Sequence, residues 1–304
     1  MLNQAAADIE SAEGVHSPRL ARAFGMEADA NVYAGDYNTA DALNHRALEI
    51  DRASYGENHP RVAEDLDHLA ESLELHGYFS QAEPLERQAL AITTRWYGPD
   101  HTETAHKMTK LASTLLYGKK YDEANDLMGR ALAIQEKIYG PDHPLVAYVV
   151  NLMGTAALAQ KRFSDAKNDY LRNVAIYRRA FGDADYRVAV SLGNLASVYH
   201  AEKNFPEAER IMQDVVPRFT RALGASNLQT GEAEVRLGRI LMLEKKYAEG
   251  AKYSLAGFEA LKNQMSPDSA WLAGARTDLA YAYTQLGETE KARLFSIKLE
   301  ASSK

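Results

Sequence analysis

Three columns of residues recur every 42 positions and predict an all-α solenoid, a stack of similar helical pairs. The first column is aromatic and holds Tyr37, Phe79, Tyr121, Phe163, Phe205 and Tyr247. The second column is small and holds Ala40, Ala82, Ala124, Ala166, Ala208, Gly250 and Ala292. The third column holds Gly14, Gly56, Gly98, Gly140, Gly182 and Gly224. Since each repeat buries its apolar face only against its neighbours, we expect one continuous domain over residues 1–304.

Each repeat is predicted to contain two helices, and the second full repeat illustrates them. Val62, Leu66 and Leu69 follow a spacing of about 3.6 residues and line one side of the first helix, helix A. Gly77 interrupts this helix, and Ser80 is placed to cap the second helix, helix B. A glycine of the third column follows helix B, where a left-handed backbone conformation is common.

The helical pairs can be counted from the expected starts of helix A. These lie near residues 18, 60, 102, 144, 186, 228 and 270, which gives about seven repeats. Residues 1–13 precede them and are expected to form an N-terminal cap or the remaining helix of an incomplete repeat. The pattern is less regular after residue 215, because Pro217 falls inside a helix B and Gly257 replaces an alanine. We expect a kink and a local change of geometry in the fifth and sixth repeats.

His59, His101 and His143 occupy the same position in the turn before helix A. Three histidines in phase could bind a metal ion, but the repeat places them in a row along the stack with few other ligands nearby. We expect them to cap the helices or to pack within the turns.

Composition and motifs argue against several classes of function. A formal charge of −7, from 42 acids and 35 bases, lacks the basic excess of nucleic-acid-binding proteins. The absence of cysteine excludes disulfides and thiolate metal sites. The zinc motif HExxH, the phosphate loop and the nucleophile elbow are missing, as are an 18-residue apolar run and a signal peptide. We therefore expect a cytoplasmic protein that is not an enzyme, with no cofactor, no metal and no membrane insertion.

Two segments resemble tetratricopeptide repeats: LASTLLYGKKYDEANDLMGRALAIQEKIYGPDHPLVA at 111–147 and VAVSLGNLASVYHAEKNFPEAERIM at 188–212. The period of 42 residues and the YGPDHP turn resemble the kinesin light chain type, and the resemblance covers residues 14–303. It implies a right-handed superhelix whose concave groove, lined mainly by helix A, binds a segment of a partner protein. The long coiled coil of a kinesin light chain is absent, so motor binding is not implied.

Helix A carries the candidate partner-binding residues. On a helical wheel Glu64, Asp67 and Glu71 point away from helix B, and the matching positions of later repeats differ in chemistry. Kinesin light chains often place an asparagine that grips the partner's backbone just before the Leu-Ala pair of helix A. Asn194 matches that position, and Asn151 lies one place earlier in its own repeat. The predicted groove residues are Glu64, Asp67, Glu71, Thr109, Ser113, Tyr148, Asn151, Thr155, Asn194, Ser197, Arg239 and Tyr281.

The sequence thus predicts a non-catalytic interaction module, an adaptor or scaffold, that binds another protein or a peptide segment. The acids of the second repeat favour a basic segment at that end, although a solvated helix face also explains them. Tyr148 and Tyr281 are candidate partner anchors, and ordinary surface placement explains them equally well.

Two further interpretations stay open at this point. One is a regulatory sensor that responds to a ligand or peptide by bending near Pro217. The other concerns the last helix B, whose apolar residues could meet a further repeat or join two copies through their terminal repeats. These residues are Leu294, Phe295, Ile297 and Leu299.

Overall fold

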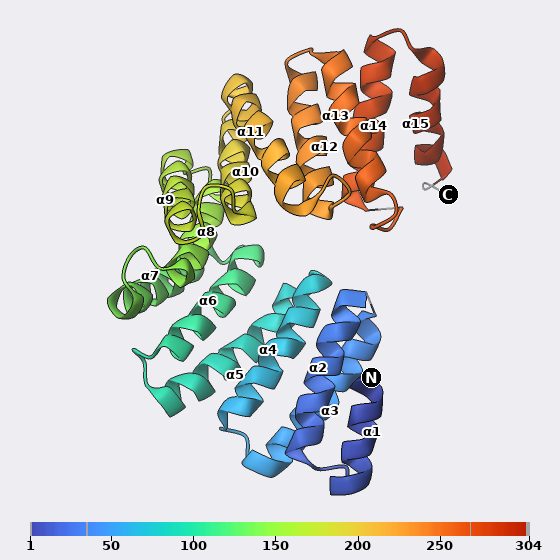
Figure 1. The fold of residues 1–304 in the computed structure, drawn as a ribbon. Helices are drawn as coiled ribbons and strands as arrows, with labels where there is room; N and C mark the ends of the chain where they lie inside the picture. The colour runs from blue at the N-terminus through green and yellow to red at the C-terminus, as the bar shows by residue number, and fades with distance from the viewer. Residues whose placement is uncertain (1, 35, 268, 302–304) are drawn as a thin grey trace. The chain divides into compact units, whose positions relative to one another are not determined.

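The protein consists of α-helices connected by short turns (Figure 1). The computed structural model describes the backbone of residues 2–34, 36–267 and 269–301, and the side chains of residues 4–32, 36–267 and 269–296. Within these described ranges the chain forms 15 helices and no strand, which confirms the predicted all-α class. None of the described helices is both long and apolar enough to cross a membrane.

The helices group into two compact units, Met1–Pro141 and Asp142–Lys304, named here the N-terminal and C-terminal units. The N-terminal unit contains α1 (Leu2–Glu13), α2 (Pro18–Ala34), α3 (Tyr37–Tyr55), α4 (Pro60–Leu75), α5 (Phe79–Tyr97), α6 (Thr102–Tyr117) and α7 (Tyr121–Tyr139). The C-terminal unit contains α8 (Pro144–Ala159), α9 (Phe163–Phe181), α10 (Tyr186–Ala201), α11 (Phe205–Leu223), α12 (Leu228–Leu243), α13 (Tyr247–Leu261), α14 (Ala270–Gln285) and α15 (Thr289–Ala301). A single continuous domain and a right-handed superhelix stay predictions.

The even-numbered helices from α2 to α14 are the A helices, and the odd-numbered helices from α3 to α15 are the B helices. Each A helix packs against the B helix that follows it, and within each unit each B helix packs against the next A helix (Figure 1). The small column lies where A and B cross, and Ala82, Ala124 and Ala166 are fully buried there. Small side chains at a crossing let two helices approach to about 8 Å, so the period of this column follows from packing.

The three turn histidines cap the A helices, as predicted. Nδ1 of His59 accepts a hydrogen bond from the backbone N–H of Arg61, with a donor–acceptor distance of 3.2 Å. His101 and His143 cap α6 and α8 in the same way, at 3.1 and 3.2 Å. The ring of His59 also stacks on Tyr55, with 4.4 Å between ring centroids. These contacts account for the recurrence of histidine without a metal ion.

The turn between helix A and helix B requires a left-handed backbone conformation. Gly77 has a φ of 76° at this position, whereas Lys119, Lys161, Lys203 and Lys245 adopt φ values of 58° to 63°. A side chain is disfavoured in this region, so these lysines hold a strained conformation at equivalent places in four repeats.

The predicted cap at Ser80 is wrong. Helix α5 begins one residue earlier, at Phe79, and its N-cap position is Tyr78, which makes no side-chain capping bond. The start at the aromatic residue recurs with the repeat, since α3, α5, α7, α9, α11 and α13 all begin at the residue of the aromatic column. Phe79 stacks on Tyr117 with 5.4 Å between ring centroids.

The fifth and sixth repeats hold the irregular positions of the sequence, Pro217 and Gly257. Helix α11 runs without interruption through Pro217, and a kink there stays a prediction. In the sixth repeat, α12 and α13 approach each other closely. A Cβ at Gly238 would lie 2.8 Å from the carbonyl oxygen of Gly250, and a Cβ at Gly257 would lie 2.5 Å from that of Gly231. Glycine at these positions therefore marks tight packing of the sixth repeat, not a weakened one.

Candidate functional site

The candidate site is the A-helix face, the side of the A helices turned away from their B helices. It comprises α2, α4 and α6 in the N-terminal unit and α8, α10, α12 and α14 in the C-terminal unit, and each part is described separately. Glu64 and Glu71 are exposed, but Asp67 between them has an exposed fraction of only 4%. Thr109, in the same column as Asp67, is also buried, and its Oγ1 donates to the carbonyl of Ala105 at 2.8 Å.

The burial of Asp67 and Thr109 limits the set of predicted groove residues. A wheel of one helix separates the side facing helix B from the opposite side, but it omits the A helix of the next repeat. Lys107 of α6 pairs with Asp67 from the next repeat, whereas Glu64 and Glu71 on either side of Asp67 are exposed. Asp67 therefore holds two adjacent repeats together, and the Thr109 hydroxyl is occupied by a hydrogen bond within α6.

In the N-terminal unit the acids of α4 meet lysines of α6. The Asp67 carboxylate forms an ion pair with Lys107, and both side chains are buried. Lys110 lies 3.8 Å from Asp67 Oδ2 and forms an ion pair with Glu71. Glu64 pairs with Arg61 of its own helix at 3.0 Å. The acidic surface indicated by the sequence is therefore largely neutralised by bases within the chain.

Beneath this network lies Glu86 of α5, which is almost fully buried. Burial and, after it, the negative charge of Asp67 raise the pKa of the Glu86 carboxyl to about 8. Oε2 of Glu86 has no hydrogen-bond partner. Glu86 is thus largely protonated at neutral pH and adds no full negative charge to the cluster.

We expect Glu86→Gln to reduce the dependence of stability on pH. Because the pKa of Glu86 is raised on folding, the folded chain binds more protons than the unfolded chain, and stability falls as pH rises from about 4.5 to about 8. One such proton contributes a slope of up to about 1.4 kcal/mol per pH unit, which the amide removes. Urea unfolding at several pH values measures this slope. Glu49→Gln, which removes an exposed carboxyl of α3, is the control and should retain it.

Glu71 also borders an open pocket of the N-terminal unit, with a volume of 370 Å³. Its other lining residues are Glu74, Leu75, Phe79 and Tyr117. Ser113 of α6 is half-buried and lies in the same column as Glu71. The pocket thus places the exposed carboxylate of Glu71 beside an apolar and aromatic wall.

In the C-terminal unit the two predicted asparagines contact each other. Asn194 Nδ2 on α10 donates a hydrogen bond of 2.9 Å to Asn151 Oδ1 on α8. Thr155 is tied to the same place, because its Oγ1 donates to the Asn151 carbonyl at 3.0 Å and lies 3.1 Å from the Tyr170 hydroxyl. Asn151, Thr155 and Asn194 therefore form one polar cluster joining two repeats.

Arginines of α12 connect that helix to both of its A-helix neighbours. Arg236 Nη2 donates to the Gly193 carbonyl at 2.6 Å and also to Ser197 Oγ on α10. Arg239 Nε donates to Asp278 Oδ2 on α14 at 2.9 Å. Only Ser197 and Arg239 of these residues were among the predicted groove residues.

Arg239 lines two adjoining pockets of the C-terminal unit. The first has a volume of 340 Å³ and is lined by Ala196, Ser197, His200, Arg236, Arg239, Ile240 and Trp271. The second has a volume of 290 Å³ and is lined by Arg239, Met242, Leu243, Lys245, Tyr247, Asp278 and Tyr281. Burial lowers the pKa of His200, and the positive charges of Arg239 and Arg236 lower it further. These pockets combine cationic groups with apolar and aromatic walls.

Trp271 was missed by the sequence reasoning, although a signal for it was present. The matching positions of earlier repeats hold Arg61, Glu103, Leu145, Arg187 and Gln229. Trp271, at the start of α14, is thus the aromatic residue in a column that holds no aromatic side chain in those repeats. Among the predicted anchors, Tyr148 is 48% exposed and Tyr281 is 50% exposed, and the ring of Tyr281 packs edge-on against Tyr247 at 5.9 Å between centroids.

Solved structures share this fold. The repeats of a kinesin light chain-like protein from Podosopora anserina align with a TM-score of 0.58 and 21% identity, covering 67% of this chain and 96% of that one. A signal transduction ATPase with numerous domains from Pyrococcus horikoshii, which has a tetratricopeptide repeat sensor, aligns with a TM-score of 0.67 and 16% identity, covering 92% and 43%. A Rap protein complexed with competence and sporulation factor aligns with a TM-score of 0.63 and 16% identity, covering 98% and 78%.

Sequence comparison gives the family directly. No curated protein matches the sequence as a whole. The sequence profile of the tetratricopeptide repeat matches residues 19–95, 81–137, 103–179 and 151–221, which together span most of the chain. With its helical pairs and its 42-residue period, the chain belongs to the tetratricopeptide repeat family.

Proposed function

We propose that this chain is a non-catalytic interaction module that binds a peptide segment of a partner protein along the A-helix face. The observation that carries the proposal is the pair of adjoining pockets that share Arg239 in the C-terminal unit. Repeats of this family generally serve as protein-interaction scaffolds, and the Rap neighbour is described in complex with a bound factor. Both facts support a binding role for this chain.

The lining of the pockets favours a segment with an apolar side chain next to a carboxylate. Ala196, Ile240 and Trp271 offer an apolar wall to the first. Arg239 uses Nε for Asp278, and its guanidinium carries further N–H groups that suit a carboxylate. Tyr281 in the second pocket offers an aromatic contact.

A basic segment at the second repeat is a weaker proposal than the sequence suggested, because Lys107 and Lys110 already pair with Asp67 and Glu71. The sensor hypothesis stays a prediction, because it depends on bending near Pro217, and the close packing of α12 against α13 does not support a weakened sixth repeat. Pairing of two copies through the terminal repeats stays a prediction. Of its apolar residues, the side chains of Ile297 and Leu299 lie outside the described ones.

The test is selection of short random peptides on the intact chain, followed by affinity measurements on variants. We expect the selected peptides to combine acidic and apolar residues, and Trp271→Ala and Arg239→Gln each to weaken their binding by about tenfold or more. Arg210→Gln is the matched control, because Arg210 is an exposed arginine on the B helix α11 of the same unit. Peptides that bind both pocket variants as tightly as the unaltered chain would contradict the proposal.

A further inference from the structure

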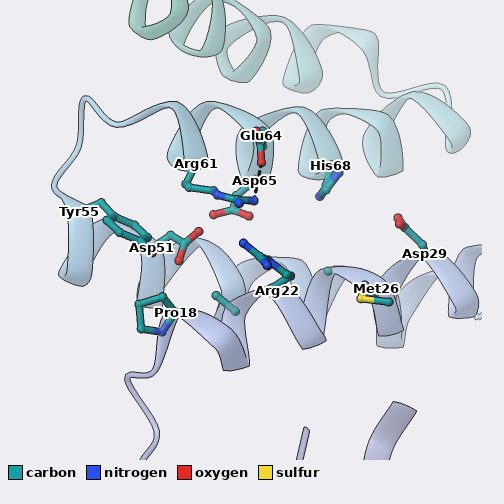
Figure 2. Close-up of a pocket in the computed structure, with 12 residues that line it drawn as sticks. Pro18, Arg22, Met26, Asp29, Asp51, Tyr55, Arg61, Glu64, Asp65 and His68 are labelled. Carbon is teal, nitrogen blue, oxygen red and sulfur yellow. Dashed lines mark hydrogen bonds and ion pairs between the residues drawn. The ribbon is translucent and has the colours of Figure 1, made fainter. Parts of the chain in front are cut away.

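A second kind of pocket lies in the N-terminal unit between α2, α3 and α4 (Figure 2). It has a volume of 140 Å³. Figure 2 shows Arg22 rising from α2 towards the carboxylates of Asp51 on α3 and Asp65 on α4. Arg61 and Glu64, joined by an ion pair of 3.0 Å, lie on the opposite wall. None of the proposed peptide-binding residues of the C-terminal unit takes part in this pocket.

Asp51 and Asp65 are both buried, and each has a carboxylate oxygen without a hydrogen-bond partner. Their exposed fractions are 5% and 8%. Neither Asp51 Oδ1 nor Asp65 Oδ2 accepts a hydrogen bond from the protein. Arginines lie nearby, and their charges act favourably on both carboxylates, but none of them donates a hydrogen bond to these two oxygens. A buried carboxylate oxygen without a donor is unfavourable, so two such oxygens beside a pocket point to a ligand that supplies the donors.

The repeat architecture does not require acids at these two positions. The residues that match Asp51 in later repeats are Thr93, Gln135, Tyr177, Phe219 and Leu261. The residues that match Asp65 are Lys107, Val149, Ser191, Ala233 and Ala275. No later repeat has a carboxylate at either position, so the pair is a local feature of this pocket and not part of the common packing.

The charge of the lining favours a cation. Four carboxylates, from Asp29, Asp51, Glu64 and Asp65, line the pocket with only two guanidinium groups, from Arg22 and Arg61. No cluster of three or more metal-ligating His, Asp or Glu side chains occurs among the described residues, which favours an organic cation over a metal ion. The excess of acceptors therefore fits a group that donates several hydrogen bonds.

The size of the pocket limits the ligand further. Tyr55, Met26 and Pro18 contribute apolar surface to the walls. A cavity of about 150 Å³ holds a molecule the size of benzene, so a short alkyl chain of a few carbons fits here. We propose that this pocket binds a primary ammonium group on a short alkyl stem, with Asp51 and Asp65 as its acceptors. Such a group is carried by a free amine or by a lysine side chain of a partner.

Binding should strengthen as pH rises through neutrality. Burial and, after it, the charges of Asp51 and Glu64 raise the pKa of Asp65 to about 7. The ionised carboxylate is the form that accepts from an ammonium group, and its fraction rises about tenfold between pH 6 and pH 8 for a pKa near 7. The titratable and charged groups around Asp65 are Arg22 and Asp29 from α2, Asp51, Arg52 and Tyr55 from α3, and Arg61, Glu64 and His68 from α4.

The experiment titrates the intact chain with n-butylammonium chloride at low salt and compares n-butanol, its neutral analogue. We expect saturable binding of n-butylammonium, no saturable binding of n-butanol, and an affinity that rises about tenfold from pH 6 to pH 8. Asp51→Asn and Asp65→Asn should each weaken n-butylammonium binding at pH 8 by about tenfold or more. Glu49→Gln, at an exposed carboxyl of α3, is the matched control and should bind normally.

A second arm separates the two sources of the ammonium group. Nα-acetyl-lysine amide should bind at least as tightly as n-butylammonium if a lysine side chain is the natural ligand, and more weakly if the pocket takes only a free amine. Equal binding of n-butanol, or n-butylammonium binding that neither asparagine variant weakens, would overturn the proposal. If a variant fails to fold, the pH dependence of n-butylammonium affinity in the unaltered chain tests the proposal instead. An affinity that is constant from pH 6 to pH 8 would exclude Asp65 as an acceptor. The proposed peptide site is not involved, so the two proposals can fail separately.

Discussion

Replacing Gly238 by alanine is expected to destabilise the C-terminal unit by about 3 kcal/mol. The added Cβ would lie 2.8 Å from both the Gly250 carbonyl oxygen and the Ser254 backbone nitrogen, so the α13 backbone itself would have to move. Alanine normally stabilises a helix relative to glycine by about 1 kcal/mol, but this gain is smaller than the strain of separating two packed helices. Urea unfolding followed by circular dichroism measures the effect.

Gly129→Ala is the control for that experiment because it should have the opposite sign. Gly129 lies on an exposed side of α7, and a Cβ there would meet nothing within 4 Å. We expect a stabilisation of about 0.5–1 kcal/mol from helix propensity alone. If both glycine substitutions stabilised the chain, the close approach of α12 and α13 would be wrong.

Lys107→Met is expected to destabilise the N-terminal unit by about 3 kcal/mol, because it leaves the buried Asp67 carboxylate without its main partner. Lys110, at 3.8 Å from Asp67 Oδ2, offsets part of the loss. The effect should appear as a lower midpoint of urea unfolding.

The double variant Asp67→Leu with Lys107→Met separates the ion pair from the packing. Since apolar residues of similar volume often replace a buried pair without loss, we expect the double variant to regain most of the stability. A double variant as unstable as Lys107→Met alone would show that packing around these side chains, and not the unpaired charge, determines the effect.

Much of the fold could be predicted from the sequence because the repeat constrains it. Glycine after helix B allows a left-handed backbone conformation, and histidine before helix A caps that helix. Both roles depend only on residues nearby along the chain. Gly98 has a φ of 96°, and His101 caps α6 as expected. The prediction at Ser80 failed because it was drawn from one repeat, whereas the B helices from α3 to α13 all begin one residue earlier, at the aromatic column.

The candidate site was less predictable because it depends on contacts between repeats. Lys107 meets Asp67 and Lys110 meets Glu71 at separations of 40 and 39 residues. Arg236 meets Ser197, and Asp278 meets Arg239, each at 39. A search for complementary side chains a little less than one period apart would have found these pairs. The pocket shapes had no comparable signal, because they depend on how far each side chain reaches.

The side-chain pairs between neighbouring repeats also make the repeats less interchangeable. A strict period of 42 residues suggests that one repeat could be removed and the remainder would close up in register. If residues 102–143 were lost, Val149 would take the place of Lys107 and Leu152 that of Lys110. Asp67 and Glu71 would then face apolar side chains. The backbone repeats regularly, but the ion pairs and hydrogen bonds between neighbouring repeats do not. Deleting or exchanging repeats should therefore preserve stability only when the side chains that pair across each new junction are kept together.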